Sequence, residues 1–144
     1  MIILDTNTIS EPLKPVPSHN VLRWLASQDQ ASIFTTAITQ AEIYSGIEMM
    51  PAGKKRQHLY KAVEGIFDED LQGQVLAFDH DAAREFAKIS ALRKSAGRPI
   101  SQFDAMIAAI TRAHRATLAT RNTADFDHCG IRLVNPWAAK SDVH

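Results

Sequence analysis

The chain has 144 residues, which is enough for one globular domain with its own core. Hydrophobic residues make up 45% of it and charged residues 22%, an ordinary balance that excludes a largely disordered protein. Lysine and arginine together number 16, as do aspartate and glutamate, so the net charge indicates no particular partner. Any binding of nucleic acid would therefore depend on a local basic patch.

The single cysteine, Cys129, excludes an internal disulfide and a cysteine-based zinc site. Residues 1–5 are too few, and become charged too early, to form a signal peptide. No stretch approaches the ~18 uninterrupted apolar residues of a membrane span. We therefore expect a soluble, intracellular protein that works in a reducing cytoplasm.

Short apolar runs alternate along the chain with segments in which apolar residues recur at helical spacing. In chain order the predicted elements are a strand at 2–4, a proline-dense loop at 11–17, a helix capped by Ser18, a strand at 31–36, a helix capped by Thr39, a helix from about Lys54, a strand at 74–78, a helix from Asp79 to Gly97, a helix capped by Ser101, and strands at 116–119 and 131–134. This alternation predicts an α/β fold of three layers, α/β/α, with a central parallel sheet of about five short strands.

Four acids lie where a predicted strand gives way to a helix. They are Asp5, Glu42, Asp104 and Asp125. In a parallel sheet such positions converge at the carboxyl ends of the strands. Crowded carboxylates cannot all stay ionised without a cation, and hard divalent ions suit sites made only of oxygen. The acids therefore predict a metal site that acts on phosphate.

Each acid also has a purely structural interpretation. Glu42, Asp104 and Asp125 each follow a predicted capping residue by three positions, where an acid can close a capping box and interact with the helix dipole. Asp5 can be a plain N-cap. The interpretation as a site depends on whether the four positions share one edge of one sheet.

Four motifs resemble, in order and at similar spacing, those of PIN-domain ribonucleases. They are residues 2–10 (IILDTNTIS), 39–46 (TQAEIYSG), 103–109 (FDAMIAA) and 120–126 (TRNTADF). The ending at 134–137 (VNPW) resembles the FitB and plasmid-stability branch of VapC-type toxins. The resemblance covers roughly residues 1 to 138, so we predict a PIN-like nuclease domain at 1–138 and a short C-terminal tail at 139–144.

The resemblance implies a Mg²⁺- or Mn²⁺-dependent endoribonuclease that is the toxin of a type II toxin–antitoxin pair. Its partners would be an RNA substrate, a small antitoxin protein and a second copy of the chain in a homodimer. Asp5, Glu42 and Asp104 would be the metal-binding acids. Many relatives carry an acid at the position of Asn122, and here Asp125, one turn on, could supply that charge instead. We expect one tightly held ion and a second that arrives with the substrate.

The expected reaction is hydrolysis of an RNA phosphodiester bond by a metal-activated water, which one free carboxylate orients or deprotonates. Thr6, Asn7, Thr120 and Asn122 are the predicted supporting residues. The two threonines either hydrogen-bond to the acids or to a phosphate oxygen, or only stabilise their turns. Arg121 either binds substrate phosphate or forms a plain salt bridge.

Arg93, Lys94 and Arg98 form a basic cluster that either follows an RNA backbone or lies on a solvated helix face. The main alternative for the whole protein is a catalytically weak or inactive PIN scaffold that only binds a protein or RNA partner. A haloacid-dehalogenase-type phosphatase would need a second aspartate in place of Asn7. A receiver domain would need an acid beside Asp5 and a lysine after a late strand.

Overall fold

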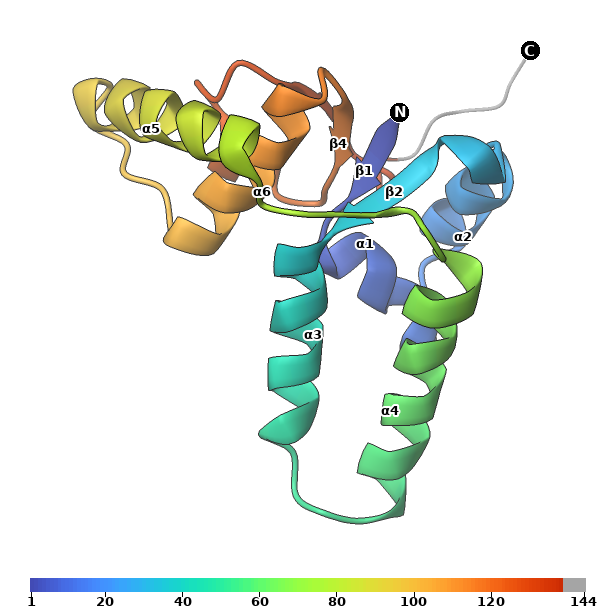
Figure 1. Ribbon diagram of the computed structural model, residues 1–144. Helices are drawn as coiled ribbons and strands as arrows, with labels where there is room; N and C mark the ends of the chain where they lie inside the picture. Colours follow the sequence, from blue (N-terminus) through green and yellow to red (C-terminus); the bar gives the residue numbers. More distant parts are fainter. Residues whose placement is uncertain (139–144) are drawn as a thin grey trace.

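Five short parallel strands form the central sheet of the part of the chain that the structure describes, residues 1–138 (Figure 1). This computed structural model places them in the order β3-β2-β1-β4-β5. The strands are β1 (Ile2–Leu4), β2 (Ile33–Thr36), β3 (Val75–Leu76), β4 (Thr117–Ala119) and β5 (Arg132–Val134). The predicted parallel sheet of about five short strands is confirmed. The predicted tail at 139–144 lies outside the described residues.

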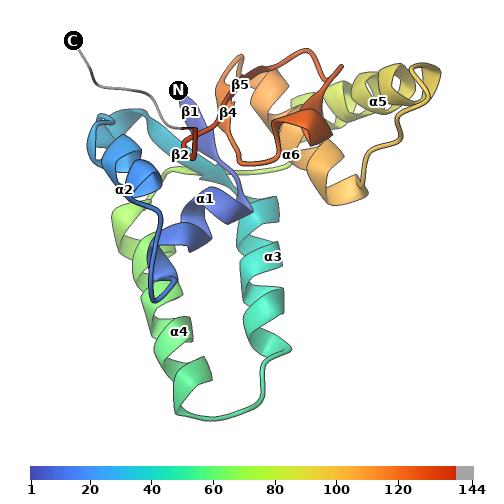
Figure 2. The same cartoon turned by 180° about the vertical axis from the view of Figure 1, so that it is seen from behind.

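Helices cover both faces of the sheet, which gives the predicted three layers (Figures 1 and 2). On one face lie α5 (His80–Ser95) and α6 (Gln102–Ala113), and on the other lie α1 (Thr6–Ser10), α2 (His19–Ala26), α3 (Ala37–Glu48) and α4 (Lys54–Gly65). Four short helical segments join these elements: η1 (Glu11–Leu13), η2 (Gln30–Ser32), η3 (Ile66–Asp70) and η4 (Thr123–Phe126).

Side chains of the central strands alternate between two hydrophobic cores, as the pleat of a strand requires. Ile3 and Leu118 pack with Ile107 of α6 in one core. Leu4 packs with Ile43 of α3 in the other. Because both faces of the sheet are covered, the strands have almost no polar face, and this is why they read as continuous apolar runs.

The predicted helix caps at Ser18, Asp79 and Ser101 are confirmed, and the predicted cap at Thr39 is wrong. The side chains of Ser18, Asp79 and Ser101 each accept a hydrogen bond from a backbone N–H in the first turn of α2, α5 and α6. In α3 the cap is Thr36 rather than Thr39, because the extended strand ends at Thr36 and its hydroxyl accepts from the N–H of Thr39 at 3.0 Å. Helix α3 therefore begins at Ala37, three residues earlier than a Thr39 cap requires.

The carboxyl ends of β1, β2 and β4 lie side by side where the strand order reverses around β1. Helices α1 and α3 start at this edge because each follows one of these strands, and α6 starts there because it leads back to the beginning of β4. Helix α3 contacts both α1 and α6. Three helix N-termini thus meet at one edge of the sheet, the position where open α/β folds bind their ligands.

Helices α3 and α4 run next to each other as a hairpin that projects away from the sheet (Figure 1). Met49, at the tip of this hairpin, is 82% exposed. No helix within residues 1–138 combines the length and the apolar character needed to cross a membrane.

Candidate metal centre

Asp5 lies at the carboxyl end of β1 and is only 6% exposed. It is the N-cap of α1, since its Oδ1 accepts a hydrogen bond from the N–H of Thr8 at 3.2 Å. The hydroxyl of Thr8 donates to the same oxygen at 3.2 Å, and the hydroxyl of Thr120 donates to Oδ2 at 2.6 Å. Asp5 is therefore a helix cap and also has an oxygen directed toward β4, so the two interpretations do not exclude each other.

Thr120 directly follows β4 and is fully buried. Besides donating to Asp5, its hydroxyl accepts a hydrogen bond from the N–H of Asn122 at 3.1 Å. One hydroxyl thus links the end of β1 to the turn that carries Asn122 and Asp125. The structure places Thr120 where a supporting residue for Asp5 must lie.

Glu42 lies in the second turn of α3 and is half-buried. Its Oε1 accepts a hydrogen bond from the hydroxyl of Thr6 at 2.9 Å, a contact that ties α3 to α1. The capping-box interpretation of Glu42 is wrong, because the helix starts at Ala37 and the carboxylate is bonded across to another helix.

Asp104 lies in the first turn of α6 and is half-buried. Its N–H donates to the hydroxyl of the Ser101 cap at 3.2 Å. The predicted cap at this helix is therefore present. The charge of the Asp104 carboxylate nevertheless acts on the other acids.

Burial raises the pKa of Asp5, Glu42 and Asp104 above the usual carboxyl range. Neighbouring charges add to this effect: Asp104 raises the pKa of Asp5, and both of these raise the pKa of Glu42. Asp125 in turn raises the pKa of Asp104. The four predicted acids are therefore electrostatic neighbours at one edge of one sheet.

The three inner acids have donor groups and charge that fit a hard divalent cation. Their hydrogen-bond partners are hydroxyl and backbone groups, and within residues 1–138 no lysine or arginine forms an ion pair with them. The present side-chain positions do not form a coordination shell, since no three acidic, histidine or cysteine side chains of the described residues converge as metal ligands. Like charges, oxygen donors and the lack of a cationic partner suit Mg²⁺ or Mn²⁺.

Asp125 and Asn122 both lie at η4, and both are exposed. Neither side chain makes a hydrogen bond within the described residues, so the predicted cap at Asn122 is wrong. The charge of Asp125 acts on Asp104, whereas Asn122 has no charge to contribute. Within residues 1–138 no hydrogen bond or ion pair joins the exposed Asn7 or Arg121 to the acids of the site. The Arg121 guanidinium lies over the ring of Trp137, 5.4 Å from its centroid.

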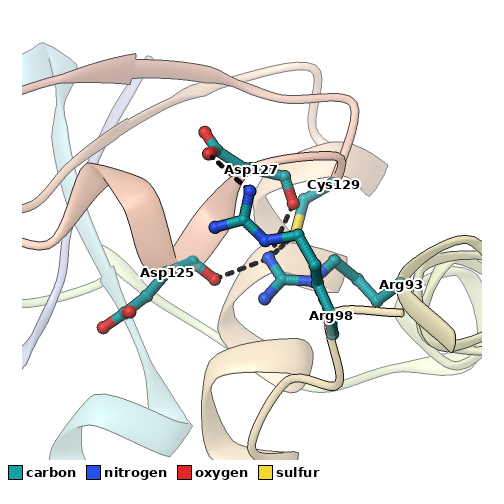
Figure 3. Close-up of polar contacts among 5 residues, drawn as sticks. All are labelled: Arg93, Arg98, Asp125, Asp127 and Cys129. Carbon is teal, nitrogen blue, oxygen red and sulfur yellow. Dashed lines mark hydrogen bonds and ion pairs between the residues drawn. The ribbon is translucent and has the colours of Figure 1, made fainter. Parts of the chain in front are cut away.

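Arg93 of α5 is a residue whose place the sequence did not suggest. We expected a solvated or RNA-facing side chain, but Arg93 is only 5% exposed and donates to the backbone carbonyls of Arg98, Asp125 and Asp127 (Figure 3). The overlooked signal is its spacing, because Arg93 follows the fully buried Ile89 by four residues and so lies on the buried face of α5.

Comparisons with known proteins agree with this arrangement. The family model described as "PIN domain" matches residues 2–131. The chain is 42% identical over 137 residues to "VapC ribonuclease Y4jK" of Sinorhizobium fredii, an alignment that covers 95% of this chain and 98% of that one. It is 38% identical over 137 residues to "Toxin FitB" of Neisseria gonorrhoeae, covering 95% and 99%. Among solved structures, FitAB bound to the IR36 DNA fragment superposes with a TM-score of 0.92 at 37% identity and covers 99% of each chain.

Proposed function

This chain belongs to the PIN-domain family, and on that premise we propose that it is a metal-dependent endoribonuclease, the toxin of a type II toxin–antitoxin pair. The observation that carries the proposal is the group of Asp5, Glu42 and Asp104 at one edge of the sheet. Burial raises the pKa of each of these acids. Neighbouring acids raise it further, since Asp104 acts on Asp5, both of these act on Glu42, and Asp125 acts on Asp104. The names of the similar ribonuclease and toxin support the same activity.

Asp5, Glu42 and Asp104 would hold the Mg²⁺ or Mn²⁺ ion. When bound, such an ion polarises the phosphate and lowers the pKa of a coordinated water. Thr120 and Thr8 keep Asp5 directed into the site through their hydroxyl donors.

The remaining acid, Asp125, is exposed and its carboxylate has no hydrogen-bond partner within residues 1–138. It is therefore free to orient the attacking water and accept its proton, which is the role of a general base. Thr6 holds the Glu42 carboxylate at 2.9 Å and so fixes the side of the site formed by α3. Asn122 and Asn7 offer exposed amide oxygens and amide donors for phosphate or water at the rim.

We propose a small antitoxin as the protein partner and a homodimer as the assembly, in the cytoplasm. The likeness to the structure of FitAB bound to DNA supports a toxin that works in a complex. Large apolar side chains remain exposed for such contacts, among them Met49, Leu92 and Phe103.

The decisive experiment is RNA cleavage by the purified protein with Mg²⁺, with Mn²⁺ or with EDTA. We expect cleavage in either metal and none in EDTA. Asp5→Asn and Asp104→Asn should each slow cleavage by about 10²–10⁴-fold, because each removes a charge that the ion needs. The matched control is Asp81→Asn, which changes an exposed acid in the first turn of α5 whose charge is not among those that shift the pKa of Asp5, Glu42 or Asp104.

Two results would count against the proposal in different ways. If the Asp5 and Asp104 variants cut RNA as fast as the parent, the assignment of the metal site is wrong. If the parent cuts no RNA in either metal while it still binds an antitoxin, the chain is a binding scaffold. The amide at Asn122 is the observation that favours this second candidate.

A further inference from the structure

We propose that Arg93 is a positioning residue for the nuclease site, which holds the turn that carries Asp125 in place beside Asp104. The inference rests on the proposed function, because it concerns the same group of acids. Arg93 itself touches neither carboxylate group in the structure. Its effect would pass through the backbone to which its guanidinium is bonded.

The guanidinium of Arg93 binds backbone from two separate segments (Figure 3). Its Nε donates to the carbonyl of Arg98 at 2.6 Å, in the segment that leads into α6. Its Nη1 donates to the carbonyl of Asp125 at 2.7 Å and to that of Asp127 at 2.6 Å. One side chain thus joins the approach to Asp104 and the turn that bears Asp125.

The burial of Arg93 favours a role beyond packing. Within residues 1–138 this guanidinium pairs with no carboxylate, although it is only 5% exposed. A buried charge is costly, and an apolar side chain of similar volume would usually fill the same space at lower cost. What an apolar side chain cannot do is hold three carbonyl oxygens in a fixed fork geometry.

Asp125 depends on the contact of its backbone with Arg93, because its own carboxylate makes no hydrogen bond within the described residues. Its position is set by its backbone: the N–H donates to the carbonyl of Asn122 at 3.0 Å, and the carbonyl accepts from Arg93. The turn η4 has only four residues, so few local bonds stabilise it. The contact with Arg93 ties this turn to α5.

The same arrangement fixes the electrostatics between the two acids. The Asp125 charge raises the pKa of Asp104, whereas the Arg93 charge lowers it. A turn that moved away from α6 would weaken the effect of Asp125 on Asp104 and leave Arg93 as the nearer charge. Arg93 therefore sets how closely Asp125 approaches Asp104, and with it how strongly this side of the site attracts a divalent ion.

The test is Arg93→Lys, which keeps the positive charge but replaces the fork by a single ammonium. Two measurements are made without RNA: Mn²⁺ affinity by titration, and hydrogen exchange of the backbone amides at 123–127. We expect the Kd for Mn²⁺ to rise about tenfold, as for other outer residues that support metal ligands. We expect the 123–127 amides to exchange at least several-fold faster, with those of α3 unchanged.

Arg98→Lys is the matched control because it makes the same exchange at a neighbouring arginine whose guanidinium binds no backbone carbonyl of the turn. Its side chain is 48% exposed and lies 3.5 Å from the Asp127 carboxylate, while the Arg98 carbonyl that Arg93 binds is retained. This variant should keep the parental Kd within about twofold. An equal loss in Arg98→Lys would overturn the proposal, since any exchange of arginine for lysine beside this turn would then explain the effect.

A double-variant comparison identifies the residue through which Arg93 acts. In an Asp125→Asn background, Arg93→Lys should weaken Mn²⁺ binding little further. A full additional tenfold loss there, or parental affinity and exchange in Arg93→Lys alone, contradicts the proposal. A parent that binds Mn²⁺ but cuts no RNA contradicts the proposed function instead, and the role of Arg93 is then still decided by affinity and exchange.

Discussion

The two ends of helix α1 each hold a nearly buried carboxylate, Asp5 at 6% exposure and Glu11 at 4%. Glu11 has a cationic partner, with Lys14 Nζ at 2.9 Å from its Oε1, and it also accepts from the N–H of Ser18 at 2.9 Å. Asp5 has only hydroxyl and backbone donors. The contacts of Lys14 and Ser18 lower the pKa of Glu11, whereas burial raises the pKa of Asp5.

Under the proposed function, this difference separates a carboxylate that stabilises the fold from one that belongs to the metal site. Both partners of Glu11 lie within seven residues of it, so the chain satisfies this acid locally. Asp5 instead depends on Thr120, which lies 115 positions away, and its other neighbours include further acids. A buried acid without a cation is costly in the free protein, and a bound divalent ion removes that cost.

Among the partners of these two carboxylates, the hydroxyl that holds Asp5 should have the largest effect when it is removed. Thr120→Val keeps the side-chain volume but deletes the donor to Asp5 and the acceptor for Asn122. We expect RNA cleavage to fall about 10–100-fold and the free energy of unfolding to fall by about 1–3 kcal/mol. Cleavage rates and urea unfolding curves measure the two effects.

Thr111→Val is the control for this change. Thr111 is also fully buried, but its hydroxyl donates only to the carbonyl of Ile107 within α6. Its replacement should cost some stability and leave cleavage at the parental rate. Equal cleavage by Thr120→Val and the parent would show that Asp5 needs no hydroxyl support, and the contrast between Asp5 and Glu11 would lose its meaning.

A smaller effect of definite sign is expected for Asp104→Asn in EDTA. The pKa of Asp104 is raised in the folded protein, so the folded form binds a proton more tightly than the unfolded chain does. Stability therefore falls as the pH rises from about 3.8, the ordinary pKa of this side chain, through the folded pKa. The asparagine of the variant does not titrate, so its side chain causes no such loss of stability. At pH 8 we expect the variant to be more stable by about 1 kcal/mol at most, or about 3 °C in Tm, because Asp104 is partly solvated.

Thermal unfolding across pH and metal concentration checks this prediction. The advantage of Asp104→Asn should shrink on acidification through the folded pKa and vanish near pH 3.8. Mn²⁺ at about 100 times its Kd should stabilise the parent by about 2.7 kcal/mol and the variant far less. A variant that is less stable than the parent in EDTA at pH 8 would mean that Asp104 is mainly a structural acid.

The layers of the fold could be predicted from the sequence because the signals are local. Apolar runs such as 2–4 mark doubly covered strands, and Ser101 marks the start of α6 through a single side chain. The cap at α3 was misplaced because Thr36 and Thr39 are equally good caps in sequence. The strand that ends at Thr36 decides between them, and its length depends on pairing with β1 and β3.

The candidate site could be predicted only in part, for a related reason. The acids were found because each lies at the cap or within the first two turns of a helical segment. Thr6 and Thr120 were predicted as supporting residues, but the pairing of Thr6 with Glu42 and of Thr120 with Asp5 joins positions 36 and 115 residues apart. No local pattern encodes which acid each threonine binds. Arg93 was missed because a basic residue predicts exposure. Its burial follows from the position it occupies on α5.

The smallest expected effect concerns the other end of α1, where Glu11→Gln removes a charge that already has a cation. The pKa of Glu11 is lowered in the folded protein. The charge of Glu11 therefore stabilises the fold at any pH above its ordinary pKa of 4.5, and this contribution is lost as the pH falls through the folded pKa. At pH 8 we expect Tm to fall by about 1–2 °C, because Lys14 is half exposed and its ion pair is screened. The sign is opposite to that for Asp104→Asn, and Mn²⁺ should stabilise Glu11→Gln as much as the parent. A rise in Tm, or a loss of stabilisation by Mn²⁺, would place Glu11 with the site acids and remove the distinction between the two ends of the helix.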